Sequence, residues 1–261
     1  MLRTSIHKCS FLSAIALAIG AMVALAASVQ AAVLTLDSVV RVSSIVSTPV
    51  DLTATGGMDW AYWAPNTGTV VAPLVAPTND KLGGTAIGNL DIVGGTGLRG
   101  SATSTTDERY SFTDGSVTAS GTNQSLAGLI FNGLTGTSGV GTGLKLSITG
   151  DPAQERLVTL YLGGFASTSS LNISLNGVAL PITDAKTFPN TSPKQIDVYT
   201  LRFQPNSASD QLLVQYTASA VSDVTNGHVG LQAVTVAAAP EPATMALLCL
   251  GGWAVCRRRR R

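Results

Sequence analysis

Cysteine is almost absent from this chain of 261 residues, and its three cysteines lie near the two ends, as Cys9, Cys249 and Cys256. The long middle part therefore has no disulfide and no metal site built on cysteine. We expect its stability to come from core burial, for which about 200 residues suffice. The two cysteines of the last segment are interpreted as small apolar residues.

Histidine is equally scarce, because His228 is the only one between residues 32 and 239. One histidine without cysteine excludes His-rich metal sites and Cys–His catalytic pairs there. A Ser–His–Asp triad stays formally open, but no Gly-x-Ser-x-Gly elbow occurs. Since His228 follows Asn226-Gly227 and opens the last predicted strand, we expect a surface turn histidine rather than a catalyst.

Charged residues make up 12% of the chain, and seven of the 16 Lys and Arg lie in the two end segments. Between residues 33 and 239, nine Lys and Arg face 14 Asp and Glu, a net charge of −5. A mildly acidic body argues against nucleic acid and anionic membrane surfaces as partners. The scarcity of Lys and Glu beside abundant Ser, Thr, Gly and Asn favours strands over helices.

Strand-like runs dominate this body. Leu144, Leu146 and Ile148 alternate with a period of two, and the apolar run at 156–165 is typical of a central strand buried on both sides. Asn176-Gly177 signals a hairpin after a further alternating run. Strands are predicted at residues 32–42, 108–113, 143–149, 156–165, 171–175, 195–203, 211–218 and 228–236.

Six of these strands follow one another at short spacing in the second half, and apolar residues nowhere repeat at helical spacing. This pattern predicts an all-β fold, a single antiparallel β-sandwich over residues 32–239. Residues 66–106 are rich in Gly, Pro, Thr and Ser. We expect long loops and short edge strands in one face of the sandwich, with a flexible insertion as the alternative.

Trp60, Tyr62 and Trp63 form the main candidate binding group. On a strand, Trp60 and Tyr62 share one face and Trp63 points to the other. One face must pack the core, so at least one ring could be exposed to stack on a sugar. The alternative is that all three pack in the core or at an edge.

Acidic residues offer two weaker candidates. The pairs Asp107-Glu108 and Asp151…Glu155 could supply two carboxyls to a glycosidase, although solvated turns are expected. Asp51, Asp59 and Asp80 could hold a structural Ca²⁺ without EF-hand spacing; no other cofactor is predicted. The sequence Gly-x-Gly-x-x-Gly at 95–100 lacks a following helix and is interpreted as a loop.

The first 31 residues have the order of a secretory signal peptide. A basic start is followed by an apolar run at 11–27 and by Val29-Gln30-Ala31, which predicts cleavage between Ala31 and Ala32. A permanent transmembrane helix is the alternative.

The last 22 residues, 240–261, combine three features. Pro240, Glu241 and Pro242 form an extended peptide, because each proline disfavours helix at the preceding residue. The 14 apolar residues that follow would span roughly 21 Å as a helix, short of the roughly 30 Å hydrocarbon core. Five cations close the segment and hold that end on the cytoplasmic side: Arg257, Arg258, Arg259, Arg260 and Arg261. We predict a hydrophobic helix that anchors weakly in the inner membrane; a basic tail that binds nucleic acid or is disordered is the alternative.

This combination resembles the PEP-CTERM sorting signal of Gram-negative bacteria. The resemblance covers residues 240–261 and implies recognition by an exosortase, a membrane-embedded cysteine protease/transpeptidase, with processing near Pro240-Glu241-Pro242. It also implies a cell envelope that handles exopolysaccharide or extracellular matrix.

The body resembles a recurrent extracellular module with a galactose-binding-type jelly roll. The resemblance is carried by residues 50–53, 59–63, 110–115, 160–164, 171–175 and 230–234, and the segment 66–106 departs from it. Such modules are often appended to sugar-active or surface proteins, so the resemblance implies a jelly-roll-like sandwich without fixing its ligand.

Three functions follow as hypotheses. The first is a non-enzymatic envelope or matrix protein, exported, anchored and then released to the cell surface. The second is a carbohydrate-binding module for exopolysaccharide, resting on Trp60, Tyr62 and Trp63. The third is a secreted hydrolase.

Overall fold

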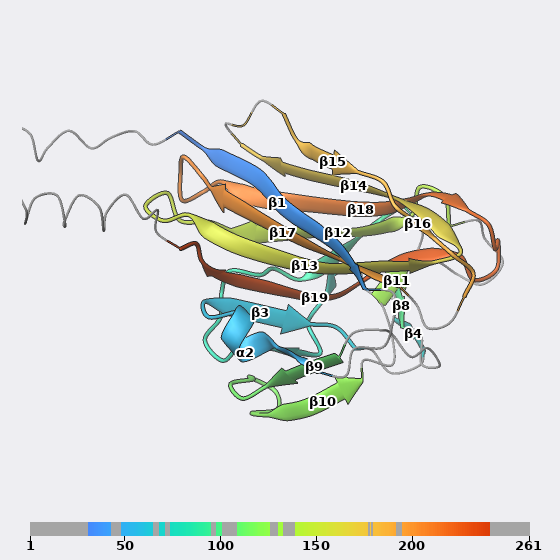
Figure 1. Ribbon diagram of the computed structural model, residues 1–261, viewed down its shortest axis with the longest axis horizontal. Helices are drawn as coiled ribbons and strands as arrows, with labels where there is room; N and C mark the ends of the chain where they lie inside the picture. The colour runs from blue at the N-terminus through green and yellow to red at the C-terminus, as the bar shows by residue number, and fades with distance from the viewer. Residues whose placement is uncertain are drawn as a thin grey trace, which may run out of the picture. The chain divides into compact units, whose positions relative to one another are not determined.

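The computed structural model describes residues 31–42, 48–64, 68–70, 74–94, 98–100, 109–125, 130–132, 139–176, 178, 180–191 and 195–240. The predicted signal helix and hydrophobic C-terminal helix lie outside these residues. Regular structure in the described part is almost entirely β (Figure 1). One helical turn, α2 (Leu52–Thr55), begins at Asp51, whose carboxylate accepts a hydrogen bond from the Ala54 N–H at 3.1 Å. The predicted all-β class is confirmed.

Nine of the described strands form the large sheet, in which every pairing is antiparallel. Its main path runs β1-β17-β13-β19-β11-β8-β4, and β3 pairs with β19 and β6. The strands are β1 (Val33–Val42), β17 (Ile196–Gln204), β13 (Arg156–Phe165), β19 (His228–Ala238), β11 (Ile130–Asn132), β8 (Leu98–Gly100), β4 (Gly68–Val70), β3 (Asp59–Tyr62) and β6 (Asn79–Asp80).

The second sheet is also antiparallel and contains seven of the described strands, in the order β15-β14-β18-β12-β7-β5 with β16 beside β14. Its strands are β15 (Ile182–Asp184), β14 (Ser167–Leu175), β18 (Gln211–Val221), β12 (Gly143–Thr149), β7 (Leu90–Val93), β5 (Leu74–Val75) and β16 (Thr187–Phe188).

The main core lies between these two sheets. Alternate residues of β12 and β14 are buried there, as predicted for Leu144, Leu146 and Ile148. They meet alternate residues of β13, β17 and β19. The buried contributors from the large sheet include Val158, Leu160, Leu162, Tyr199, Leu201, Phe203, Leu231, Val234 and Val236. The antiparallel sheets are thus arranged as a β-sandwich, while the jelly-roll topology stays a prediction.

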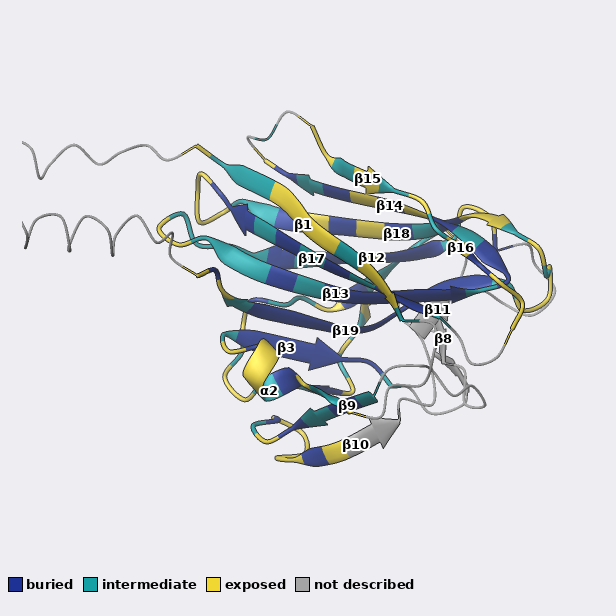
Figure 2. Cartoon of the chain, viewed as in Figure 1, coloured by how far each residue is buried: buried dark blue, intermediate teal, exposed yellow. Residues whose placement is uncertain are grey.

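A third layer, which the sequence analysis did not predict, covers the other face of the large sheet. It consists of α2 and a small sheet of β10 (Gly121–Ser125), β9 (Arg109–Phe112) and β2 (Val50–Asp51), in which β2 and β9 are parallel. Its core joins Leu52, Tyr110 and Phe112 to side chains from β3, β13, β17 and β19. β13 and β19 are consequently buried on both faces (Figure 2).

Three local predictions need correction. The described strands of residues 66–106 do not all lie in one face of the sandwich. β4, β6 and β8 join the large sheet, whereas β5 and β7 join the second. The last three residues of the glycine motif, Leu98–Gly100, form a strand rather than a loop; Gly95 and Gly97 lie outside the described residues. After β14 the chain pairs again only from Ile182, so the hairpin loop is longer than a two-residue Asn-Gly turn.

Candidate functional site: the exit of the sorting segment

β19, the strand that leads into the predicted sorting segment, is held firmly in the large sheet. It pairs with β13 from Phe165↔His228 to Arg156↔Ala238. On its other side it pairs with β3 and β11. Nine of its eleven residues are buried. The chain therefore reaches the sorting segment from a central strand.

The contacts of the body continue to the residue before the first proline. The Ala239 N–H donates to the Glu155 carbonyl at 3.0 Å, and Ala239 is buried while Pro240 is exposed. Glu241, Pro242 and the five terminal arginines lie outside the described residues. Pro240 is thus the first residue of the segment and directly follows Ala239, which is bonded to the body. Sequence patterns carry no signal for this contact, because it joins two backbone groups.

The start of the body lies at the same end of the large sheet. Leu34 pairs with Phe203, Phe203 with Arg156, and Arg156 with Ala238, so the four residues form one row across β1, β17, β13 and β19. Three strand spacings of about 4.8 Å separate Leu34 from Ala238 by about 14 Å. We call this the terminal end of the sandwich; it lies to the left in Figure 1.

The predicted signal cleavage site falls next to this row. Ala31 is exposed and Ala32 is half-buried. The contacts within the chain divide it into units Met1–Ala31 and Ala32–Arg261. Cleavage between Ala31 and Ala32 stays a prediction.

The aromatic cluster is buried: the alternative that all three rings pack in the core is confirmed, and a ring exposed for sugar stacking is not found among them. Trp60 and Trp63 are 0% exposed and Tyr62 is 7% exposed. As expected for a strand, the rings divide between faces: Trp60 and Tyr62 pack in the third-layer core, with Trp60 4.9 Å from the Phe112 ring, and Trp63 packs in the main core. The third layer is the physical reason, because it covers the face of β3 that would otherwise meet solvent.

The three candidate calcium ligands have separate structural roles. Asp51 begins α2. Asp59 is buried and accepts hydrogen bonds from the Ala86 and Ile87 N–H groups at 2.7 and 3.0 Å. Burial raises the pKa of Asp59 above its ordinary value, although these N–H groups act in the opposite direction. Asp80 accepts from the Ser116 hydroxyl. Within the described ranges, no group of three or more His, Cys, Asp or Glu is placed to hold a metal ion.

The acidic pairs and His228 also have structural surroundings. Asp151 accepts a hydrogen bond from the Ala153 N–H at 2.8 Å in the β12–β13 turn, and Glu155 lies 3.9 Å from Arg202. Asp107 and Glu108 lie outside the described residues. The surface position predicted for His228 is wrong: it is 4% exposed, and its ring stacks on Phe165 with centroids 5.9 Å apart. The reason is that His228 already pairs with Phe165 in the sheet.

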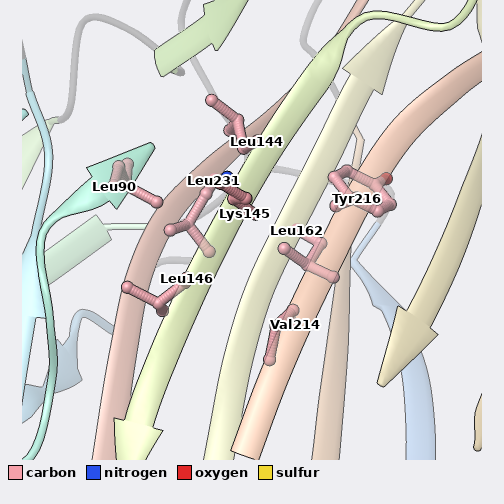
Figure 3. Close-up of a pocket in the computed structure, with 8 residues that line it drawn as sticks. All are labelled: Leu90, Leu144, Lys145, Leu146, Leu162, Val214, Tyr216 and Leu231. Atoms are coloured by element: carbon pink, nitrogen blue, oxygen red, sulfur yellow. The ribbon is translucent and has the colours of Figure 1, made fainter. Parts of the chain in front are cut away.

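A small cavity lies in the main core between the two sheets (Figure 3). Its volume is about 10 Å³, near the lower limit for one water molecule. The lining is mostly apolar: Leu90, Leu144, Lys145, Leu146, Leu162, Val214, Tyr216 and Leu231. We interpret it as a packing defect rather than a ligand site.

Comparison with known proteins assigns the C-terminal segment. Residues 238–261 match the family model described as the PEP-CTERM protein-sorting motif. No curated protein matches the chain. Among the helices that the structure describes, none has the length and apolar character needed to cross a membrane. The chain therefore carries a PEP-CTERM sorting motif, which implies export, processing by an exosortase and membrane anchoring at the C-terminal segment.

Proposed function

We propose that this chain is an exported, non-enzymatic protein of the cell envelope or extracellular matrix, delivered through its C-terminal motif. The observation that carries the proposal is the match of residues 238–261, which begins at the last residue of the central strand β19. In this proposal the sandwich is the delivered body. After processing near Pro240-Glu241-Pro242, it is released from the membrane to the cell surface.

The positions of the candidate catalytic groups support a non-enzymatic role. The His228 ring lies buried against Phe165, with ring centroids 5.9 Å apart. Asp151 lies in the β12–β13 turn, where its carboxylate accepts from the Ala153 N–H. The Glu155 carbonyl accepts from the Ala239 N–H, next to the start of the sorting segment. Each of these groups therefore has a structural task.

The residues that suggested carbohydrate binding are not available to a sugar in the folded body. A ring that stacks on a sugar needs an open face, whereas Trp60, Tyr62 and Trp63 are buried. The described surface offers no other aromatic group that favours this function, so we do not propose it.

The test compares processing in two bacterial hosts that differ only in an exosortase gene. The full chain is expressed in both, and an antibody against the body follows its mass and membrane fractionation. We expect a C-terminally shortened form only where the exosortase is present. Mass spectrometry should place the new C-terminus near residues 240–242.

A triple substitution tests whether processing depends on the Pro-Glu-Pro sequence itself. Pro240→Ala, Glu241→Ala and Pro242→Ala together should leave the chain full-length in the membrane fraction of the exosortase host. Pro152→Ala is the matched control, because it lies in a turn at the same end of the sandwich and should be processed normally. Identical processing in the two hosts would reject the proposal.

A further inference from the structure

We propose that the terminal end of the sandwich is a membrane-facing surface that contacts the lipid headgroups while the sorting segment is inserted. This inference rests on the proposed function, because it takes the apolar run from Ala243 onward as the inserted part. It adds a surface of the folded body, and the orientation of that body, to the role of the segment.

The length of the connection limits how far the body can lie from the bilayer. Ala239 is held by Glu155, and four residues lead from it to Ala243. Even fully extended, four residues span about 14 Å. The headgroup region occupies about 5–7 Å of this on one side of the bilayer. The gap that remains between Ala239 and the headgroups is at most about 9 Å, so the tether keeps the loops beside Pro240 close to the headgroups.

These loops form a fixed platform. The β12–β13 turn and the β17–β18 loop lie at the terminal end, since Thr149 pairs with Gln211 and Gln204 with Val33. The Gln204 side chain donates to the Pro152 carbonyl at 2.7 Å, which joins the two loops. A Cβ atom built on Gly150 would lie 2.6 Å from the Pro205 ring, so the loops are also in close contact. The body therefore presents a defined surface beside the anchor.

Three strongly exposed apolar side chains lie on separate loops at this end. Leu180, Val117 and Leu82 have the highest exposures among the described large hydrophobic residues, at 79%, 72% and 71%. Leu180 lies in the loop after β14, whose last residue, Leu175, pairs with Leu212 next to the β17–β18 loop. Leu82 follows Lys81, whose backbone N–H donates to the Trp60 carbonyl. Lys81 also forms an isolated β-bridge with Gly115, two residues before Val117. Because Asp59 pairs with Val236, the start of β3 lies beside the last residues of β19.

The charges at this end favour a neutral lipid surface as the occupant. Asp151, Glu155 and Asp210 lie on its loops. Its exposed cation Arg202 already pairs with Asp37 at 2.8 Å and lies 3.9 Å from Glu155. An excess of acid gives no attraction to anionic lipid, so the contact comes from the short tether and the apolar tips. It should therefore occur on zwitterionic bilayers.

The experiment places one environment-sensitive dye on the full chain, with its three native cysteines changed to alanine, in phosphatidylcholine vesicles. Leu180→Cys and Val117→Cys carry the dye at the terminal end. Val140→Cys and Val224→Cys are matched controls, because both are exposed valines on loops at the opposite end. We expect a blue shift and quenching by headgroup-labelled lipid at the first two positions and neither effect at the controls.

A second variant tests the tether. A flexible linker of 20 Gly and Ser residues between Ala239 and Pro240 should abolish the quenching while the chain still floats with the vesicles. If the chains float with the vesicles but the dye shows the same emission and quenching at all four positions, the membrane-facing surface is overturned. The proposed anchoring would then stay intact. Chains that do not float would instead overturn the anchoring itself, and this surface with it. Quenching that survives the linker would reject the tether argument.

Discussion

Asp114 is the residue that joins most parts of the third layer. One carboxylate oxygen accepts hydrogen bonds from Trp60 Nε1 at 2.8 Å and from the Thr53 hydroxyl at 2.6 Å. The other oxygen accepts from Lys81. It therefore ties α2, β3 and the segment after β6 to the end of β9.

Asp114→Ala should lower the free energy of unfolding by about 2 kcal/mol, because it leaves the buried Trp60 N–H without its acceptor. Urea unfolding followed by tryptophan fluorescence measures this change. Asp210→Ala is the control: its carboxylate accepts a long, exposed hydrogen bond of 3.5 Å from the Asn176 side chain, so a change within about 0.5 kcal/mol is expected. Equal effects of the two substitutions would contradict the role assigned to Asp114.

The same carboxylate predicts a pH dependence. Partial burial alone would raise the pKa of Asp114, but hydrogen bonds from Lys81, Thr53 and Trp60 outweigh it, and the pKa lies below its ordinary value. A carboxyl with a lowered pKa stabilises the fold above its unfolded pKa of about 3.9 and loses this contribution as the pH falls through the folded value. The difference in unfolding free energy between wild type and Asp114→Ala should thus be constant from pH 7 to 5 and shrink below about pH 4. A constant difference down to pH 2 would contradict this.

At the scale of the elements, a buried side-chain hydrogen bond links β9 of the third layer to β19 of the large sheet. The Tyr110 hydroxyl on β9 donates to Gln232 Oε1 on β19 at 2.9 Å, and both residues are buried. Gln232 lies at the irregular position where β19 shifts register against β13, and its Nε2 is buried without a hydrogen-bond partner in the described structure.

Tyr110→Phe should cost about 1–3 kcal/mol, because it leaves the Gln232 oxygen buried and unpaired as well. Adding Gln232→Leu should recover much of this loss, since two apolar partners need no hydrogen bond. Tyr62→Phe, in the same core, is the matched control and should change stability little. Denaturant midpoints of wild type, Tyr110→Phe, Gln232→Leu and the double variant complete the cycle, with Tyr62→Phe as a fifth protein. Additive losses in the double variant would disprove the coupling.

Sequence reasoning succeeded for elements whose own residues determine them. β12 and β13 have the predicted bounds because their alternation or continuous apolar character reflects burial directly. The third layer was missed because it depends on pairings between distant segments, such as β2 with β9, which leave no local pattern.

The candidate sites divide in the same way. The sorting motif is a linear pattern, so its sequence sufficed to identify it. The exposure of Trp60 and Tyr62 depends on what covers β3, and β9 and α2 cover it from elsewhere in the chain. Likewise, the period-two pattern placed Trp63 opposite Trp60 but could not show that both faces are buried.

For the whole molecule, the position of β19 predicts the effect of truncation. A chain ending at Pro240 should keep the unfolding midpoint of the full chain, because it retains all of β19 and the bond from Ala239 to Glu155. A chain ending at Asn226 loses β19 and with it pairings to β13, β3 and β11. We expect it to lack a cooperative urea transition and near-ultraviolet circular dichroism. A cooperative transition in this shorter chain would show that the sandwich does not depend on its central strand.

The central place of β19 also sets the timing of export. It is the last of the described strands in chain order, yet it lies between β13 on one side and β3 and β11 on the other. A chain that crosses the membrane N-terminus first cannot close the large sheet until residue 238 has emerged. By then the next residues to arrive are those of the sorting motif. We therefore expect the body to stay open enough for translocation until the sorting motif reaches the bilayer, so that folding and membrane capture coincide.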